Sequence, residues 1–331
     1  MRVAVVYVLR DPEDPEKVDF AEQAAAMARF LSEAGHNASP RGVDGAIQLI
    51  EFLERDQPDF VFNLCSAKLG RNKLHMGITA IYDLFATLYV GSSALTLGLT
   101  SNKGISKALF RAGGVPTPRG TIVDDFNKLN VVDGLKPPWI VKPLTGGGSS
   151  GIDRGSVVYD DSGLRARVEF VLEKWRQPAL VEEFIEGREF TVALLAQSSS
   201  EFTTLPIVEI LFDNFPERSP HIFSYAAKWS SESLEYCATS SKCPADLDSG
   251  LEENIRRAVL SAAQVVDLKD YGRIDVRVRR DDNAVFVIDV NASPDIGADS
   301  DFVLAAKASG RTYAQVVCQV LQCAIDRYDG L

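Results

Sequence analysis

Histidine and cysteine are scarce in this chain, which has three histidines and five cysteines among 331 residues. No two cysteines are spaced as CxxC and no histidines form HExxH. The zinc sites that such spacings signal are therefore not expected. An odd number of well-separated cysteines also argues against a disulfide framework. Any metal ion should be held by carboxylate and amide oxygens.

Basic residues are outnumbered by acidic ones. The chain has 35 Lys and Arg residues against 46 Asp and Glu residues, which gives a formal charge of −11. Such a protein lacks the electrostatic footprint of a nucleic-acid or anionic-membrane binder. We predict no nucleic-acid or membrane partner, and we expect any phosphate to be bound by a few locally placed cations or metal ions.

Long hydrophobic runs are also missing. The apolar stretch Val3–Leu9 ends at a charged, proline-containing segment without a small-residue cleavage site, which favours a buried strand over a signal peptide. The stretch Leu84–Asn102 has no charge, but glycine, serine and threonine interrupt it. We interpret it as a helix end, a strand and a loop, and we expect a cytoplasmic protein.

The first hundred residues alternate strand and helix patterns. Strands are expected at Arg2–Leu9 and Phe60–Leu64, and helices at Phe20–Ala34, Ala46–Glu54 and Leu74–Leu84. This alternation predicts a parallel sheet covered by helices.

Beyond a short helix over Asn102–Gly113, strands and hairpins dominate the pattern. The expected strands are Thr121–Val123, Trp139–Lys142, Ser156–Tyr159, Leu180–Phe184, Phe190–Leu195, Thr203–Leu211, Arg273–Arg279 and Ala284–Val290, with helices over Gly163–Trp175, Leu251–Val266 and Tyr313–Asp326. The fold class is therefore a parallel α/β domain followed by a strand-rich α+β body.

A glycine-rich segment, Gly146–Gly151, matches the spacing G-x-G-x-x-G. A dinucleotide-binding fingerprint needs a strand before it and a helix after it. Here a strand pattern follows, so the segment is predicted to be a hairpin tip, and a NAD-dependent oxidoreductase is disfavoured. Backbone amides of such a loop can cover phosphates. Lys142 lies within the preceding strand, where a nearly buried ammonium requires an anionic partner.

Two carboxylates are predicted to face each other across a hairpin. A three-residue loop, Asp281–Asn283, pairs Asp275 with Asp289 and Arg273 with Asn291. Opposed carboxylates repel unless a cation lies between them.

The side chains at this pairing offer only oxygen ligands, the preference of Mg²⁺ rather than zinc. The alternative is a solvated polar face on which Arg277 compensates the charge. We favour the metal site because the other face of the hairpin is apolar.

Taken in order, these elements resemble the ATP-grasp superfamily and, within it, the D-alanine–D-alanine ligases. The resemblance covers about residues 85–312 and is carried by Lys103, Val141-Lys142-Pro143 with the Gly/Ser loop, Val181–Phe184 running to Glu189–Thr191, Ala227-Lys228, Tyr271–Asp275 and Asp289–Pro294. It implies an ATP-grasp fold with an N-terminal α/β domain (1–101), a central subdomain with a Gly/Ser flap (102–186) and a C-terminal subdomain (187–331). The last two would clamp ATP.

The resemblance also implies roles for individual residues. Lys103 and Lys142 would contact the phosphates of ATP, and the flap residues Gly147, Gly148 and Ser149 would close over the triphosphate. Glu182, Glu183 and Ile185 would contact the adenine, and Glu189 would bind the ribose. Asp275, Asp289 and Asn291 would hold two Mg²⁺ ions, for which Mn²⁺ can substitute. Arg273 would stabilise the tetrahedral intermediate, Lys228 would assist phosphoryl transfer, and Ser300 would lie near the carboxylate of the amine substrate.

The activity implied is that of a carboxylate–amine ligase with small-molecule acid and amine substrates, working as a homodimer. ATP would convert the acid to an acyl phosphate, Mg²⁺ would neutralise charge, and the amine would displace phosphate. Two alternatives stay open. One is an ATP-grasp phosphotransferase that stops at the phosphorylated acid. The other is a nucleotide-binding protein without catalysis, although a pure binder has no need of Arg273.

Four departures from the ligase pattern concern mainly the substrates. The Arg10–Asp19 segment has no clean counterpart of the Gly-rich turn with Glu and Ser that the ligases carry after the first strand. In addition, Gly148 replaces a flap serine, Asp289 replaces a glutamate, and Asp295 replaces a glycine. We therefore expect an acid and amine pair other than two D-alanines.

Overall fold

The computed structural model describes residues 1–9, 20–65, 75–132, 134–197, 201–215 and 219–330. The Arg10–Asp19 segment, with its expected loss of a substrate anchor, lies outside these residues. Three β-sheets organise the described part of the chain, and each is drawn from one of the three expected segments. The exact boundaries at residues 101 and 186 stay a prediction.

The N-terminal sheet is parallel, with the strand order β2-β1-β3-β4. Its elements are β1 (Arg2–Val8), α1 (Ala21–Glu33), β2 (Asn37–Val43), α2 (Ala46–Asp56), β3 (Phe60–Asn63), α3 (His75–Leu84) and β4 (Leu88–Tyr89). The predicted βα alternation is confirmed. Edge strand β2 escaped prediction because its sequence, NASPRGV, is polar and contains a proline.

The central sheet is antiparallel, with the order β5-β8-β6-β7. It consists of β5 (Gly120–Val123), β6 (Trp139–Pro143), β7 (Val157–Val158) and β8 (Ala179–Glu183), with the 3₁₀ helices η1 (Phe126–Val132) and η2 (Arg154–Ser156) and the helix α6 (Asp161–Trp175). Val168 and Val171 of α6 are fully buried with Val141 and Val181 of the sheet, which gives this part of the chain a core of its own.

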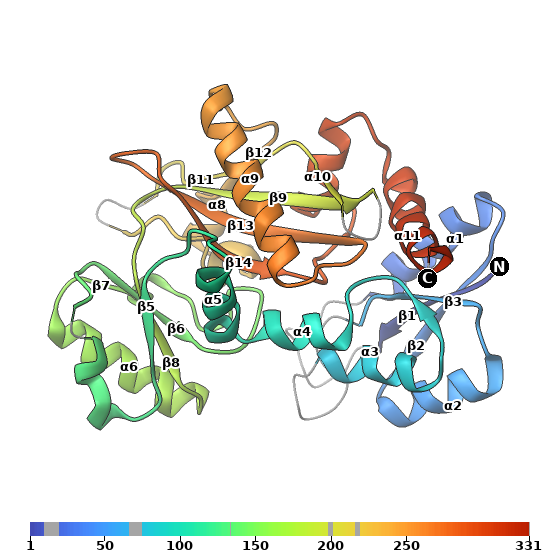
Figure 1. Cartoon of the computed structure of the whole chain (residues 1–331), viewed down its shortest axis with the longest axis horizontal. Coiled ribbons are helices and arrows are strands. Elements are labelled where there is room, and N and C mark those ends of the chain that lie inside the picture. The colour runs from blue at the N-terminus through green and yellow to red at the C-terminus, as the bar shows by residue number, and fades with distance from the viewer. Residues whose placement is uncertain (10–19, 66–74, 133, 198–200, 216–218, 331) are drawn as a thin grey trace.

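The largest sheet has the order β12-β11-β9-β13-β14, and β10 also pairs with β9. Its elements are β9 (Gly187–Ala196), β10 (Phe202–Thr204), β11 (Val208–Leu211), α7 (Tyr225–Trp229), α8 (Leu234–Cys237), β12 (Ser240–Lys242), α9 (Ser249–Val265), β13 (Tyr271–Arg279) and β14 (Val285–Asn291). Figure 1 shows α9 lying over this sheet, and Ile255, Val259 and Ala262 of the helix pack against Ile274 and Val276.

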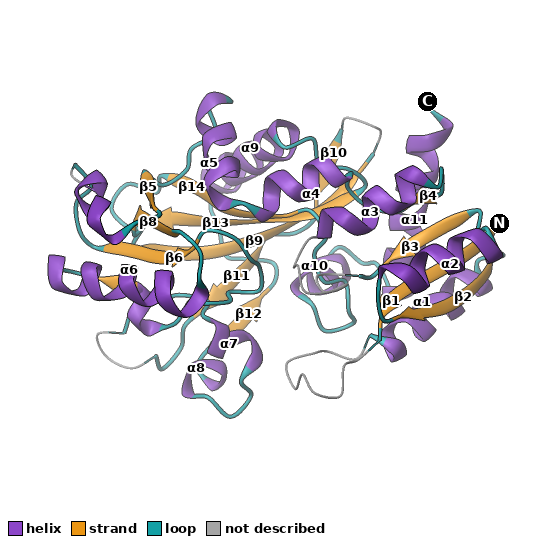
Figure 2. Cartoon of the chain, turned by 90° about the horizontal axis from the view of Figure 1, so that it is seen from below, coloured by secondary structure: helices purple, strands orange, loops and turns teal. Residues whose placement is uncertain are grey.

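The end of the chain returns to the N-terminal sheet. Helices α10 (Asp301–Ala308) and α11 (Tyr313–Asp329) follow the largest sheet, and α11 lies beside α1 in Figures 1 and 2. Val316, Val317 and Val320 of α11 are buried in one core with Val5 and Met27. The N-terminal sheet and the largest sheet therefore share one core, to which Ala193 and Tyr271 of the largest sheet also belong.

An ion-pair network also joins α11 to the segment after β4 and to the residue before β13. The guanidinium of Arg327 in α11 donates to both carboxylate oxygens of Asp270, at 2.7 and 3.0 Å, and to the backbone carbonyl of Tyr89. Asp270 also accepts from the amide of Gly91 at 2.7 Å. Burial raises the pKa of Asp270 in spite of these partners.

Three expectations about secondary structure were wrong. The uncharged stretch before residue 102 contains a further helix, α4 (Ala94–Ser101), which leads into α5 (Lys103–Ala112); its N-terminal amide at Thr96 is capped by the Ser93 hydroxyl. The single strand expected over Thr203–Leu211 is split around Pro206, which cannot donate to a ladder. No helix was expected between Val290 and Tyr313, where α10 begins at Asp301.

Candidate active site

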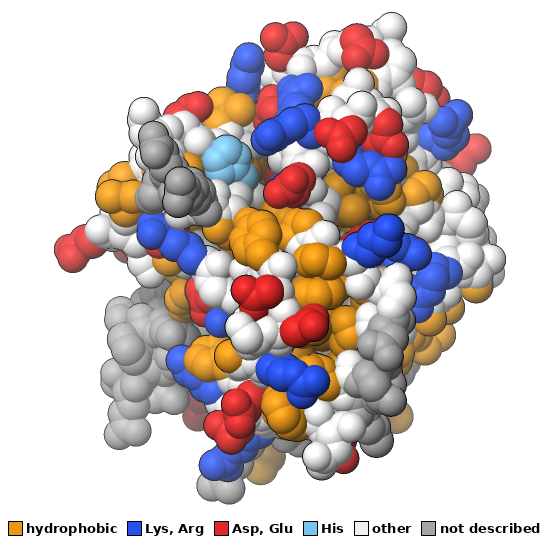
Figure 3. All heavy atoms as spheres, turned by 90° about the vertical axis from the view of Figure 1, so that its left-hand side faces the viewer, with side chains coloured by type: hydrophobic (Ala, Val, Ile, Leu, Met, Phe, Trp, Pro, Cys, Tyr) orange, Lys and Arg blue, Asp and Glu red, His pale blue; other side chains and the backbone are white. Residues whose placement is uncertain are grey.

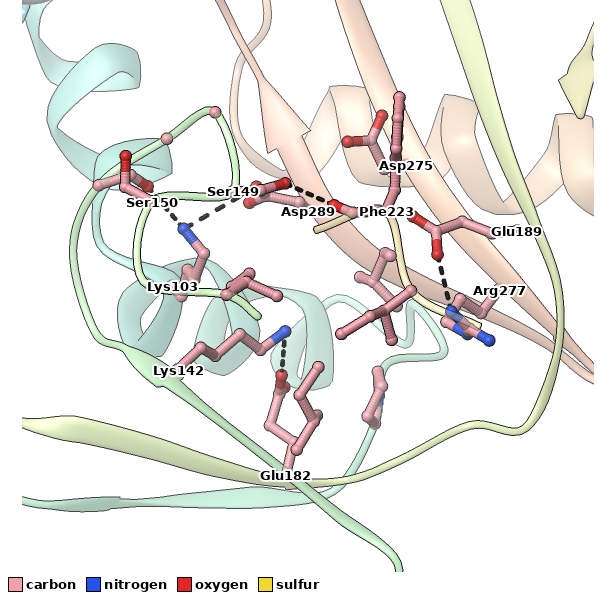
Figure 4. Close-up of a pocket in the computed structure, with 18 of the residues that line it drawn as sticks. Lys103, Lys142, Ser149, Ser150, Glu182, Glu189, Phe223, Asp275, Arg277 and Asp289 are labelled. Carbon is pink, nitrogen blue, oxygen red and sulfur yellow. Dashed lines mark hydrogen bonds and ion pairs between the residues drawn. The ribbon is translucent and has the colours of Figure 1, made fainter. Parts of the chain in front are cut away.

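A cavity lies between the central sheet and the largest sheet, where the residues singled out from the sequence come together (Figure 4). Of the predicted site residues, all but Ser300 line it. The lining includes five basic residues (Lys103, Lys142, Lys228, Arg273 and Arg277) and five acidic residues (Glu182, Glu183, Glu189, Asp275 and Asp289). The formal charges of the lining cancel, in a chain whose net charge is −11.

On the face of the molecule shown in Figure 3, acidic and basic groups are interspersed. The cavity also has apolar residues beside its charged ones. The apolar part of the lining consists of Pro118, Ile140, Pro143, Ile152, Phe184, Ile185, Ile222, Phe223 and Ile288. The cavity thus offers apolar walls for a flat, uncharged group together with cations for an anionic one.

Two of the lining residues, Lys142 and Glu182, belong to a buried triad of charges. The ammonium of Lys142 in β6 lies 2.7 Å from one carboxylate oxygen of Glu182 in β8, and the ammonium of Lys107 in α5 lies 2.9 Å from the other. The Glu182 side chain is only 1% exposed. Burial opposes its charge, yet the two lysines hold the pKa of Glu182 below its ordinary value.

The requirement of Lys142 for an anionic partner is thus confirmed, and the partner is Glu182. Lys107 was missed. Its signal was available, because Lys103, Lys107 and Phe110 follow the spacing of one helical face and all three are buried. Burial lowers the pKa of Lys107 to about 8, against the opposing influence of Glu182.

A second buried ion pair joins β9 to β13. The guanidinium of Arg277 donates to Glu189 at 2.7 Å and to the backbone carbonyls of Ile185, Gly187 and His221. Burial raises the pKa of Glu189, and Arg277 limits that rise. Arg277 therefore holds the segment between β8 and β9, rather than compensating the hairpin carboxylates as the alternative interpretation required.

The predicted pairing across the β13–β14 hairpin is confirmed. Arg273 is opposite Asn291 and Asp275 is opposite Asp289. The hairpin loop, however, is one residue longer than expected. Arg279 donates to the carbonyl of Ala284, so the loop has four residues instead of three. A β-bulge after Asp275 shifts the pairing by one residue and brings Asp275 opposite Asp289 as predicted. Asn283 has the left-handed conformation expected of it, with φ of 56°.

The two hairpin carboxylates have different neighbours. Asp275 accepts two hydrogen bonds from Arg273, at 2.8 and 2.9 Å, and a longer one from the Asn291 amide at 3.3 Å. Asp289 is more exposed, and its nearest cation is Lys103 at 3.9 Å. The pKa of Arg273 is raised, because Asp275 outweighs the effect of burial.

These residues meet the chemical requirement for Mg²⁺. Two carboxylates and an amide supply only oxygen ligands, and Mg²⁺ in nucleotide sites is bound by one or two carboxylates together with the substrate's phosphates. In the part of the chain that the structure describes, no group of three or more His, Cys, Asp and Glu side chains could hold a metal ion. Phosphate oxygens of a bound nucleotide would complete the ligands of a Mg²⁺ ion held by Asp275, Asp289 and Asn291.

The glycine-rich loop lies across the cavity and is fastened to the far side. The hydroxyl of Ser149 donates to the carbonyl of Phe223 at 2.7 Å, and the indole of Trp229 donates to the carbonyl of Gly148 at 2.9 Å. Lys103 donates to the carbonyl of Gly146 at 2.6 Å. Strands β6 and β7 flank the loop as an antiparallel pair, so the prediction of a hairpin tip is confirmed.

Two glycines of this loop have backbone conformations that favour glycine. Gly148 and Gly151 have positive φ values of 60° and 75°, which side-chain-bearing residues rarely adopt. A Cβ atom at Gly151 would also lie 2.5 Å from the ring of Pro143. The replacement of a flap serine by Gly148 thus fits the backbone that the loop adopts.

Lys228 reaches the cavity from α7. Its ammonium lies 4.4 Å from the centre of the Phe223 ring. Burial, followed by the positive charge of Arg273, lowers its pKa, although Asp275 and Glu189 act in the opposite direction.

Ser300 and Asp295 lie outside the cavity lining. The Ser300 hydroxyl caps α10 by accepting from the amide of Val303 at 3.3 Å. The Asp295 carboxylate accepts from the amide of Gly297 at 2.7 Å and is exposed. A role for Ser300 in binding the amine substrate stays a prediction.

Comparison with known proteins identifies the family. Residues 117–322 match the family model described as the D-ala D-ala ligase C-terminus. The chain belongs to this family. An uncharacterised protein of Sinorhizobium fredii is 31% identical over 327 residues, which cover 96% of this chain and 92% of that protein. The D-alanine–D-alanine ligase of Bartonella henselae is 27% identical over 294 residues, covering 88% of each.

The fold is that of the ATP-grasp ligases, as predicted. The crystal structure of D-alanine–D-alanine ligase from Bacillus anthracis complexed with ATP superimposes with a TM-score of 0.73 and 21% identity, covering 98% of this chain and 97% of that one. Among the described residues, no helix is both long and apolar enough to cross a membrane.

Proposed function

We propose that this member of the D-alanine–D-alanine ligase family is an ATP- and Mg²⁺-dependent carboxylate–amine ligase. The observation that carries the proposal is the single cavity with apolar walls, buried lysines and an oxygen-rich hairpin, crossed by a fastened glycine-rich loop. The ligase relatives and the ATP-complexed structural neighbour support the same assignment.

The chain's own groups suit the binding of a nucleoside triphosphate. Apolar walls at Ile140, Ile185 and Ile222 would enclose the adenine, and Glu189 would accept from a ribose hydroxyl. Lys103 and Lys142 would donate to the phosphates. Asp275, Asp289 and Asn291 would hold Mg²⁺, which when bound neutralises phosphate charge.

The reaction would join an acid to an amine in two steps. The carboxylate oxygen of the acid attacks the γ-phosphorus of ATP, the bond to ADP breaks, and an acyl phosphate forms. The amine nitrogen then attacks the acyl carbon, loses a proton and expels phosphate, which leaves an amide. Arg273 would stabilise the oxyanion of the second step, and Lys228 would balance charge on the transferred phosphoryl group.

The fastened loop would protect the acyl phosphate from water. Its contacts with Phe223 and Trp229 close the cavity on the side of α7, and exclusion of water prevents hydrolysis of a reactive intermediate. We further propose substrates other than a pair of D-alanines, on the basis of the Gly148, Asp289 and Asp295 replacements. A homodimer, as the resemblance implies, is part of the same proposal.

The test is a screen for phosphate release that requires both partners. Amino acids and other small carboxylic acids are combined with a panel of amines in the presence of MgATP, and ADP and phosphate are measured with each component omitted in turn. The proposal predicts at least one acid–amine pair for which omission of either partner abolishes turnover. Phosphate release with an acid alone, at a rate unaffected by any amine, would favour the phosphotransferase alternative.

A further inference from the structure

We infer that Lys107 is a positioning residue that frees Lys142 to bind the phosphates of ATP. This inference rests on the proposed function. Lys107 does not line the nucleotide cavity, whereas Lys142 and Glu182 do. Any effect of Lys107 on the nucleotide must therefore pass through a neighbour.

The geometry of the triad shows how this would work. Glu182 is shared between Lys142 at 2.7 Å and Lys107 at 2.9 Å, and all three side chains are more than nine-tenths buried. A buried carboxylate without a counter-ion is strongly disfavoured. As long as Lys107 is present, Glu182 keeps one counter-ion when the Lys142 ammonium turns to a phosphate.

Without Lys107 the same movement becomes costly. Lys142 would be the sole counter-ion of Glu182, so binding a phosphate would strip the carboxylate of its partner. Either Lys142 would stay with Glu182 and the phosphates would lose one donor, or Glu182 would be left unpaired. Both outcomes weaken ATP binding by about one charge-assisted interaction, which is roughly ten- to a hundredfold in Kd.

Lys107 has a second contact that the test must separate from the first. Its ammonium donates to the carbonyl of Val287 at 3.3 Å, within the hairpin strand β14. A role confined to supporting β14 would not depend on the charge of Glu182. A role as the counter-ion of Glu182 would disappear once that charge is removed.

The experiment is a double-mutant cycle on MgATP binding, measured by isothermal titration calorimetry with the full chain. Lys107→Met is compared with wild type, and Lys107→Met/Glu182→Gln is compared with Glu182→Gln. Arg111→Met is the matched control, since Arg111 lies one turn further along α5 and is exposed. Thermal melts verify that each variant is folded.

We expect Lys107→Met to raise the Kd for MgATP roughly ten- to a hundredfold, and Arg111→Met to leave it unchanged. In the Glu182→Gln background, loss of Lys107 should change Kd by less than about threefold. Where Lys107→Met alone fails to fold, the comparison in the Glu182→Gln background can still be made, and a tenfold or greater effect of Lys107 there would overturn the inference. Lys107→Gln, which can still donate a hydrogen bond to Glu182, then replaces Lys107→Met in the wild-type background and should weaken MgATP binding as well.

Two results would overturn the inference. One is wild-type affinity in Lys107→Met. The other is a loss in the Glu182→Gln background as large as in the wild-type background, which would place the effect of Lys107 at Val287. Absence of MgATP binding by the wild-type chain would instead contradict the proposed function itself, so the two failures are distinguishable.

Discussion

Removing the charge of Asp275 and removing that of Asp289 should have very different effects on stability, although the two residues face each other. The Asp275 and Arg273 side chains are 12% and 17% exposed and share two hydrogen bonds. Asp275→Asn leaves a buried guanidinium with a neutral neighbour. We expect it to lower the free energy of unfolding by about 1.5–3 kcal/mol, the range for hydrogen bonds to charged groups.

Asp289→Asn should lower the free energy of unfolding much less than Asp275→Asn. The Asp289 side chain is 27% exposed and lies 3.9 Å from Lys103, and partly exposed pairs of this kind contribute about 0–1 kcal/mol. Relief of repulsion from Asp275 opposes even this loss. The melting temperature without metal should therefore stay within about 2 °C of wild type, whereas Asp275→Asn should lower it by several degrees.

The assay is thermal unfolding followed by circular dichroism, without metal and again with Mg²⁺ and ATP. Both variants should lose the stabilisation that wild type gains from MgATP, because each removes a proposed metal ligand. Equal melting temperatures for the two variants without metal would refute the assignment of Arg273 to Asp275. Full stabilisation of Asp289→Asn by MgATP would refute its role as a metal ligand.

Three further predictions follow from the site. Lys142→Met should weaken ATP binding roughly tenfold to a hundredfold while the melting temperature changes little, since Lys107 still pairs with Glu182; unchanged calorimetric affinity for ATP would contradict the phosphate role. Trp229→Phe, which loses the hydrogen bond to Gly148, should raise the ratio of phosphate released to amide formed several-fold, because water hydrolyses more of the acyl phosphate. An unaltered ratio of phosphate to amide would show that this contact does not exclude water. D-alanine offered as both substrates should be turned over poorly, as measured by dipeptide formation, whereas efficient turnover at millimolar D-alanine would show that the Gly148 and Asp295 replacements do not alter specificity.

Much of the fold could be predicted because its elements have strong local patterns. The β13–β14 hairpin alternates apolar and polar residues, and its apolar face fixes which side chains share the other face. The pairing of Asp275 with Asp289 followed from that alternation. The bulge did not, because the expected loop was one residue too short and the two errors cancelled at the site.

The elements that escaped prediction are those whose residues carry weak local signals. Helix α4 is built from threonine, glycine, leucine and serine, which gave no clear apolar face, and its start depends on the Ser93 cap. Strand β2 is held by pairing with β1 rather than by its own composition. In both cases tertiary contacts outweigh local preference.

The site was predicted as a set of residues, but the partners within it were not. Lys142 was expected to meet an anion, and that anion is Glu182. The sequence did not show that Lys107, on helix α5, shares the same carboxylate. The pairing of Arg277 with Glu189, rather than with the hairpin carboxylates, likewise depends on contacts between strands far apart in sequence. Such pairings arise only once the sheets are packed.

The origin of the phosphate oxygen tests the central claim most directly. Once an acid–amine pair has been found, the acid is supplied with ¹⁸O in its carboxylate, and the phosphate released from ATP is examined by ³¹P nuclear magnetic resonance. Attack of the carboxylate on the γ-phosphorus predicts that each phosphate carries one ¹⁸O from the acid, with ADP as the other nucleotide product. Unlabelled phosphate, or release of AMP and pyrophosphate, would contradict the acyl phosphate route.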